Sequence, residues 1–338
     1  MPVTGPAVEV ALGVGRWEHM IINTGARTDT AQYYARWLLT RFREGFVYVR
    51  NPLFPEKVSR YVLDPAVVDC VVFCSKNYAP LLGGLHEIRD RYNTYFHFTI
   101  TAYGTDVEPG VPSVPDAVET LLDLERQVGA KSICWRYDPV FLTSTYTIGR
   151  HLETFAWMAE RLAGHVDRCI FSFVEVYRKL ERNFPNIIVP SLEDRDELAR
   201  GLASIAHAWH IPIQTCGNNG DWSRYGIAGS ACTTLSMLGA ANGVEFRALR
   251  HKGQRPGCGC FESRDIGCYD SCPNGCRYCY ANRSPELARR NYRELHDPES
   301  PILLGRLRET DEITEAAQRS CLVRRATAQV VPGQQRLF

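Results

Sequence analysis

The first 215 residues alternate short, apolar, β-rich segments with longer segments whose apolar residues recur at helical spacing. Strands are expected at 17–23, 67–74, 94–101, 131–137, 168–173 and 211–215, and helices at 30–43, 115–128, 147–163 and 192–209. Strands that are separated by helices form parallel sheets with crossover connections. Six or more such units predict an α/β fold of the (β/α) barrel, or TIM, type.

Two serines and one insertion refine this pattern. Ser113 and Ser191 lie close before expected helices, where a serine side chain caps the first turn. Residues 46–62 interrupt the alternation, and we expect them to form a strand–loop–strand insertion.

The regular alternation ends near residue 215. Between 216 and 282 the periodicity fades, and glycine and cysteine become frequent. We therefore expect bound metal, more than an apolar core, to stabilise the structure of this segment. A helix is expected at 285–295, and the polar sequence from about 309 is expected to be partly loose. We therefore expect a barrel body at 1–215, a cysteine-rich iron–sulfur region that completes the barrel at 216–305, and a tail at 306–338.

Composition excludes several classes of protein. Hydrophobic residues make up 45% and charged residues 23% of the 338-residue chain, which is typical of a globular fold and not of a disordered one. Lys and Arg (39) balance Asp and Glu (38), so no global field indicates a nucleic-acid or membrane partner. No apolar run reaches the roughly 18 residues of a membrane span and no signal segment is visible, so we expect a cytoplasmic protein without a membrane partner. In that reducing compartment, thirteen cysteines indicate metal or redox chemistry rather than disulfides.

Six cysteines fall within 22 residues, from Cys258 to Cys279, and three of them form a recognisable motif. Cys272, Cys276 and Cys279 have the spacing C-x3-C-x2-C, with Tyr278 before the last cysteine. Three thiolates on one tight loop can hold three irons of a [4Fe–4S] cube and leave the fourth iron open. This is the signature of radical S-adenosylmethionine (SAM) enzymes, in which the open iron binds SAM and an aromatic residue at the position of Tyr278 helps to seat it.

Two alternatives to the open cluster remain at this point. One is a structural zinc site, although zinc sites more often use paired C-x2-C knuckles and only one such pair exists here. The other is a closed cluster in which Cys268 supplies a fourth thiolate. Cys70, Cys74, Cys134 and Cys169, by contrast, are expected to be small buried hydrophobes in strands.

Polar side chains follow several expected strands, at the rim where (β/α) barrels build their active sites. The candidates for orienting SAM or substrate are Arg27, Asp29, Lys76, Asn77, Arg136 and Asp138. Guanidinium and carboxylate groups suit this task because SAM presents a ribose diol, an ammonium and a carboxylate. The alternative is that each of them caps a strand end or bonds a loop.

Several segments together resemble a prokaryotic family known as domain of unknown function 1848. They are RTD (27–29), RNPLFPEKVSR (50–60), FCSKN (73–77), WRYDP (135–139), SFVEVYRK (172–179), YGI (225–227), CGCFESRDIGCYDSC (258–272) and GCRYCYAN (275–282). The family's C-terminal cysteine cluster is similar to that of radical SAM enzymes. This chain departs from the family where GARTDTA replaces SRRTDIPA, which leaves Arg27 alone, and at Asn274, where a histidine is common and to which we assign no acid–base role.

The resemblance implies a partial, circularly permuted barrel. In ordinary radical SAM barrels the cysteine loop follows the first strand, whereas here it comes late in the chain, so residues 263–268 would supply the cluster-bearing strand beside 17–23. Cysteines at further family positions, Cys216, Cys232, Cys258 and Cys260, would ligate an auxiliary [4Fe–4S] cluster. Zinc with the same ligands and unmetallated buried thiols are the alternatives, and Cys321 is expected to have no such role.

Two features indicate DNA as the substrate, through lesion reversal or base modification. The GCRYCY core is similar to that of spore photoproduct lyase, which reverses a thymine lesion in DNA. The chain's end resembles the bacterial sliding-clamp-binding pentapeptide, with Gln334, Leu337 and Phe338 as its contact residues; the alternative is a tail packed on the barrel.

We therefore expect a radical SAM enzyme that uses one [4Fe–4S] cluster, with a second as an option, and an electron donor such as flavodoxin or ferredoxin. The rival hypothesis is a non-catalytic iron–sulfur or zinc protein that binds nucleic acid or a repair partner. A metal-independent barrel hydrolase is the third.

Overall fold

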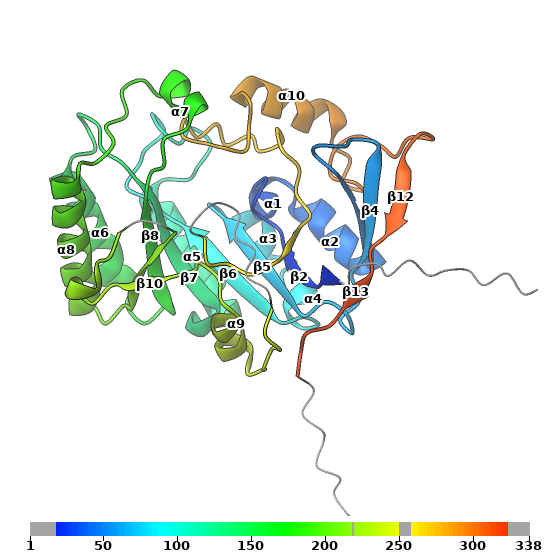
Figure 1. Ribbon diagram of the computed structural model, residues 1–338, viewed down its shortest axis with the longest axis horizontal. Helices are drawn as coiled ribbons and strands as arrows, with labels where there is room; N and C mark the ends of the chain where they lie inside the picture. The colour runs from blue at the N-terminus through cyan, green and yellow to red at the C-terminus, as the bar shows by residue number, and fades with distance from the viewer. Residues whose placement is uncertain (1–17, 218–219, 250–257, 324–338) are drawn as a thin grey trace, which may run out of the picture.

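A computed structural model of the chain describes residues 18–217, 220–249 and 258–323, and its centre is an eight-stranded, all-parallel sheet (Figure 1). The strands are, in spatial order, β10 (Ala228–Ser230), β9 (Ile213–Cys216), β8 (Arg168–Phe173), β7 (Ile133–Val140), β6 (Thr94–Thr99), β5 (Cys70–Ser75), β2 (Ile21–Asn23) and β11 (Arg264–Asp265). Among the described residues β10 and β11 stand at the two edges. The predicted α/β fold with a parallel sheet is confirmed, and its strand order is consistent with an open (β/α) barrel.

Helices cover the outer face of the sheet. They are α1 (Thr30–Tyr33), α2 (Ala35–Glu44), α3 (Ala79–Leu82), α4 (His86–Arg89), α5 (Val114–Val128), α6 (Ile148–Leu162) and α8 (Leu192–Ala208). Ser113 accepts a hydrogen bond from the backbone N–H of Asp116, and Ser191 forms a capping box with Asp194, so both expected caps are confirmed. Between helices and sheet lies the largest apolar core, to which Phe73 contributes.

The inner face of the sheet has its own, smaller apolar cluster. Successive strand residues point to opposite faces, so Val72 faces inward while Phe73 faces the outer helices. The inner cluster is covered by α9 (Leu235–Asn242), through Met237 and Leu238, and by Phe261. α9 could not be predicted from the sequence, because its apolar residues are not confined to one helix face. The cysteine-rich region thus supplies both edge strands and a cover for the inner face.

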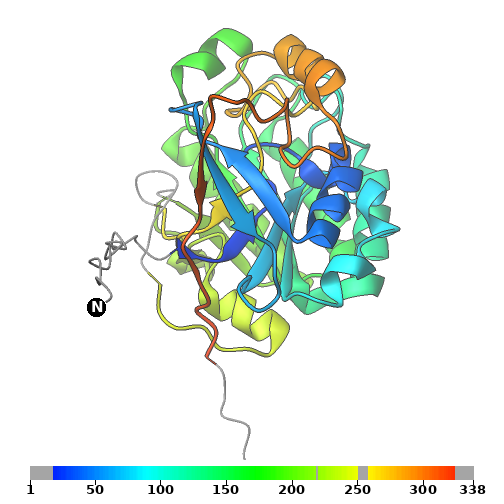
Figure 2. The ribbon, with the colours of Figure 1, turned by 90° about the vertical axis from the view of Figure 1, so that its right-hand side faces the viewer.

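The expected insertion is an antiparallel hairpin of β3 (Phe46–Arg50) and β4 (Lys57–Val62). Near the C-terminus, β12 (Glu312–Glu315) joins β4, and β13 (Gln318–Arg319) pairs with β1 (Glu18–His19) (Figure 2). Two parts of the segment that was expected to be partly loose therefore form strands, at 312–315 and 318–319. β4 offers an open edge to β12, and the fully buried carboxylate of Asp69 accepts hydrogen bonds from Ser320 and from the backbone and thiol of Cys321.

Two further helices lie near the C-terminal ends of the strands. α7 (Arg178–Asn183) follows β8, and α10 (Pro285–Leu295), which the sequence predicts at 285–295, lies at the top of Figure 1. Among the described residues there is no helix with the length and apolar character needed to cross a membrane.

Candidate metal centre

The cysteine motif lies in a loop, residues 268–283, across the C-terminal ends of the parallel strands. After β6, the N–H of Gly110 donates to the carbonyl of Asn274 at 2.8 Å, and the N–H of Arg277 donates to the carbonyl of Val107 at 3.0 Å. After β8, the Tyr177 hydroxyl donates to the carbonyl of Tyr278. The loop thus occupies the rim at which barrels of this class build their active sites.

Asp29 connects this cysteine loop to the start of α1. It is buried, and its carboxylate accepts hydrogen bonds from the Ser75 hydroxyl at 2.6 Å and the Lys76 N–H at 2.9 Å. It also accepts from Gln32 N at 3.1 Å, as the N-cap of α1, and from the Asn274 side chain at 3.4 Å. Burial raises the pKa of Asp29, and the hydrogen bonds from Lys76, Ser75 and Gln32 oppose the rise. A carboxylate with four protein donors is suited to positioning the loop rather than to contacting a ligand.

The three motif thiols act electrostatically on one another. The Cys272 side chain is buried and accepts hydrogen bonds from the backbone N–H groups of Asn274 and Asp29. Burial, followed by Glu108, raises the pKa of the Cys276 thiol, and Cys272 and Cys279 raise it further. Among the described residues no Sγ–Sγ hydrogen bond links the three. Because each thiolate of a cube binds a different iron, separated thiols are what an open cluster needs.

A buried carboxylate beside Cys276 ties the loop to two strands. Glu108 is 2% exposed, and its Oε1 accepts hydrogen bonds from Lys76 Nζ at 2.9 Å, Thr101 Oγ1 at 3.0 Å and the Tyr278 hydroxyl. Lys76 therefore lies beside the cysteine loop, as a rim residue should. Glu108 escaped the sequence analysis because it lies in the loop between β6 and α5, where no periodic pattern singles it out.

Tyr278 is held through both its ring and its backbone. Its ring packs against Phe141 at 5.7 Å and Tyr103 at 6.1 Å between centroids, in an apolar cluster separate from the other two. Its carbonyl already accepts a hydrogen bond from the Tyr177 hydroxyl. A contact between this carbonyl and the adenine of SAM would therefore require Tyr177 to share or release its bond.

Two of the expected rim residues have local partners instead. Arg27 lies 3.9 Å from the carboxylate of Asp265 on β11, and its guanidinium lies over the Tyr269 ring at 5.5 Å. The Asn77 side chain accepts a hydrogen bond from the N–H of Ala79 at 3.0 Å and so caps the turn that leads into α3. Both interactions are those of strand-end residues, which is the alternative that the sequence left open.

The fourth cysteine of the loop faces different neighbours from the other three. Burial raises the pKa of the Cys268 thiol to about 11, and the charged groups that act on it most are Arg27, Asp270, Asp265 and Arg50. None of these is a motif cysteine.

A second set of cysteines meets on the inner face of the sheet. The Sγ atoms of Cys232 and Cys260 are 3.1 Å apart, and Cys216, at the end of β9, is hydrogen-bonded to both. We call Cys216, Cys232 and Cys260 the inner thiol group. Cys258 is close enough to act electrostatically on Cys232. The sequence grouped these four cysteines, and the fold brings three of them into contact.

Arg136 and Asp138, the remaining rim candidates, lie on β7 beside the inner thiol group. They form an ion pair, and Asp138 also accepts a hydrogen bond from the Ser172 hydroxyl. The positive charge of Arg136 acts on Cys216 and Cys232. These two residues therefore belong with the inner thiols and not with the cysteine loop.

Tyr280 and Lys179 were not singled out from the sequence. Tyr280 is 64% exposed and donates to the carbonyl of Ala26, and the charges of Cys279 and Arg136 both act on its hydroxyl. Lys179 Nζ donates to the carbonyls of Tyr280, at 3.2 Å, and Asn282. Lys179 lies in the segment 172–179, so its position in a family-like motif was the available signal.

As they stand, no three His, Cys, Asp or Glu side chains within 18–217, 220–249 and 258–323 are arranged so that they could hold a metal ion. The donor types nevertheless suit soft metals, because thiolates bind iron–sulfur clusters and zinc. Binding would require the thiols to lose their protons and adjust their separations.

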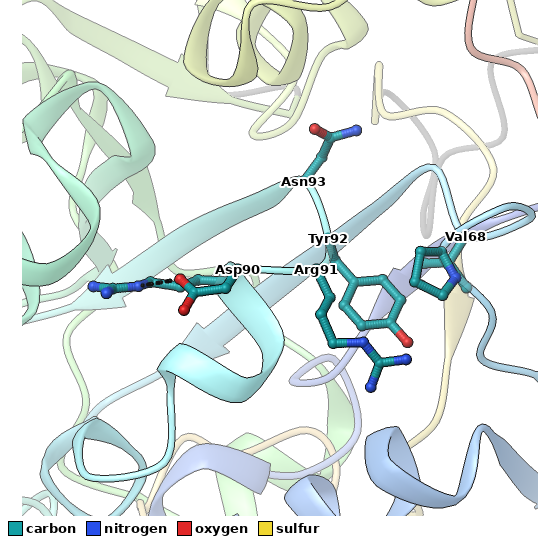
Figure 3. A pocket seen from close by; sticks show the side chains of 7 residues that line it. Val68, Asp90, Arg91, Tyr92 and Asn93 are labelled. Carbon is teal, nitrogen blue, oxygen red and sulfur yellow. Dashed lines mark hydrogen bonds and ion pairs between the residues drawn. The ribbon is translucent and has the colours of Figure 1, made fainter.

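One hollow of the surface is remote from these cysteines. It has a volume of about 280 Å³ and is lined by residues such as Val68, Arg91 and Asn93, which precede β5 and β6 (Figure 3). It therefore opens at the N-terminal ends of the strands, opposite the cysteine loop.

Comparison with known families decides the kinship of the chain. Residues 21–281, most of the chain, match the model described as "Domain of unknown function (DUF1848)". The chain belongs to the DUF1848 family. No curated protein and no solved structure matches this DUF1848 member. The proposed clamp-binding residues Gln334, Leu337 and Phe338 lie outside the described residues.

Proposed function

We propose that this DUF1848 protein is a radical SAM enzyme whose Cys272, Cys276 and Cys279 hold a [4Fe–4S] cluster with one open iron. The observation that carries the proposal is the position of three separated thiols on one loop over the C-terminal ends of a parallel sheet. When bound, such a cluster supplies the electron that cleaves SAM into methionine and a 5′-deoxyadenosyl radical.

The strand order supports a permuted relative of the radical SAM barrel. β11 pairs in parallel with β2, with Arg264 opposite Ile22, as expected for 263–268 beside 17–23. The cysteine loop then follows β11 as it follows the first strand of an ordinary radical SAM barrel. We therefore propose that β11 is the counterpart of that first strand.

The surrounding residues would fix the loop and exclude water from it. Asp29 holds Asn274, and Glu108 holds the Tyr278 hydroxyl, so both carboxylates position the loop from below. Lys76 is the rim cation whose charge acts on Cys276, and it would attract the carboxylate of SAM. The exposed Tyr280 would face the substrate.

The rival hypothesis is a metal-bearing protein that binds nucleic acid or a partner without catalysis. Anaerobic reconstitution with iron and sulfide, followed by dithionite and SAM, separates the two. The radical SAM hypothesis predicts 5′-deoxyadenosine, and iron binding without 5′-deoxyadenosine supports the rival.

We further propose DNA as the substrate class and a replication sliding clamp as the partner. The support is the similarity to spore photoproduct lyase and the C-terminal pentapeptide with Gln334, Leu337 and Phe338. The test is a titration of that peptide against the host's clamp, beside a peptide with Leu337 and Phe338 changed to Ala. Binding by the first peptide alone supports the proposal, and equal or absent binding contradicts the clamp contact.

A further inference from the structure

The inner thiol group unites three segments that are distant in sequence. Cys216 ends β9 and is 4% exposed, Cys232 follows β10, and Cys260 lies just before Phe261 in the cover of the inner face. Three partly or fully buried thiols in mutual contact are more than packing requires, because an apolar side chain would fill the same space without a polar atom.

The separation of the sulfur atoms distinguishes between two metal sites. In a tetrahedral zinc site with Zn–S bonds of about 2.3 Å, ligand sulfurs are about 3.8 Å apart. The 3.1 Å between Cys232 and Cys260 is close to this value and needs only a small expansion. In a cube each thiolate binds a separate iron, so its sulfurs must lie farther apart. The separation of Cys232 and Cys260 therefore favours a single ion over a second cluster, and binding would require the thiols to draw together around that ion.

Charge around the group suits the same interpretation. Four thiolates around one Zn²⁺ leave a net charge of about −2, which a neighbouring cation stabilises. Arg136 is that cation, since its charge acts on both Cys216 and Cys232. Cys258 acts on Cys232 and belongs to the same C-x-C pair as Cys260, so it is the available fourth ligand.

We propose that Cys216, Cys232, Cys258 and Cys260 bind one Zn²⁺ in a closed, structural site on the inner face of the sheet. Binding releases the thiol protons and leaves no coordination position open. The ion would fasten the covering segment to β9. The inference does not rest on the proposed radical SAM function.

The test uses the full chain, produced anaerobically with iron and zinc available, and measures both metals. The expected result is about one zinc per chain, which is lost in Cys232→Ala/Cys260→Ala while iron is retained. Cys70→Ala is the matched control, because Cys70 is fully buried in the same inner cluster but outside the thiol group. It should keep its zinc.

Three results would overturn the proposal: no zinc in the wild-type chain, zinc retained in the double variant, or iron lost from it in place of zinc. If the double variant does not fold, the absorption spectrum of the wild-type chain produced with cobalt in place of zinc tests the proposal. Intense thiolate-to-cobalt absorption bands of a tetrahedral site support the proposal, and their absence contradicts it. Iron content and SAM cleavage report separately on the cysteine loop.

Discussion

The cysteine loop and the inner thiol group use the same side chain in opposite ways. The loop carries its three thiols within eight residues, at the rim of the sheet, and none of the hydrogen bonds in the described part of the chain joins two of their sulfur atoms. The inner group takes its thiols from three segments that are distant in sequence, and the Sγ atoms of Cys232 and Cys260 lie 3.1 Å apart. Chain connectivity and the short sulfur separation of the inner group therefore distinguish it from the loop, for which we propose an open cluster in place of a closed single ion.

The largest expected effect concerns the loop alone. Replacing Cys272, Cys276 and Cys279 together by Ala should abolish 5′-deoxyadenosine formation, since no ligand for the cluster remains. The sheet should stay folded, because the loop lies on its rim and not in its main core. Product analysis and far-UV circular dichroism measure the two properties. Residual 5′-deoxyadenosine above the reagent background would disprove the cluster assignment.

A smaller effect is expected from the ion pair beneath the loop. Lys76→Met leaves the Glu108 carboxylate buried with one cation fewer, and should destabilise the protein by about 3–5 kcal/mol. SAM cleavage should also fall by about 10- to 100-fold, because the loop loses the cation that acts on Cys276 and that would attract the carboxylate of SAM.

The double variant Lys76→Met/Glu108→Gln is the control, since it removes both charges. Urea unfolding should find it more stable than Lys76→Met alone. Equal destabilisation by both variants would mean that the charge pair does not support the loop.

The inner group should affect stability and not the chemistry at the loop. Cys216→Ala/Cys232→Ala should lower the midpoint of thermal unfolding by more than about 5 °C, because a structural metal stabilises the folded state directly. A zinc chelator should lower the midpoint of the wild-type chain and leave that of the variant unchanged. If the chelator lowered the unfolding midpoint of both proteins equally, the inner thiol group would not be the site of a structural zinc ion.

The smallest effect probes the aromatic support of the loop by pH. Burial lowers the pKa of His151 from 6.5 to about 4, and His151 contacts Tyr103, which packs on Tyr278. Between these two pH values the unfolded chain binds a proton that the folded chain does not. The contribution of His151 to stability is therefore fully present above pH 6.5, and stability falls by up to about 2–3 kcal/mol as the pH drops toward 4.

His151→Gln tests this assignment. Glutamine can still accept from the Tyr137 hydroxyl and donate to the Phe141 carbonyl, as His151 does, but it does not titrate. Urea unfolding between pH 4 and 6.5 should give a flatter dependence than the wild type. An unchanged slope would assign the acid sensitivity to other groups.

Local periodicity determines the part of the fold that could be predicted. Six strands of the central sheet, β2 and β5 to β9, and the helices α5, α6 and α8 were expected because their apolar residues recur at the period of the element. β10 was not predicted, because it has only three residues. The loop motif was found for a similar reason, since its ligands are close in sequence. β12 and β13 were missed because they pair with strands near the other end of the chain, and their own sequence is polar.

The support of the site depended on contacts between distant segments. Glu108 supports the loop because it accepts hydrogen bonds from Lys76 and Tyr278, and Asp29 supports it because it accepts one from Asn274. No local sequence pattern reveals these contacts. Family-like positions grouped the inner cysteines, but only the fold gives the sulfur separation that favours zinc over a second cluster.

The central claim is that the cysteine loop leaves one iron of its cluster open, and electron paramagnetic resonance tests it most directly. The chain is reconstituted anaerobically, reduced with dithionite and measured with and without SAM. The account predicts a cluster signal that changes when SAM is added and that is absent from the variant lacking Cys272, Cys276 and Cys279. A spectrum that is identical with and without SAM would contradict it, since every iron would then be ligated by the protein.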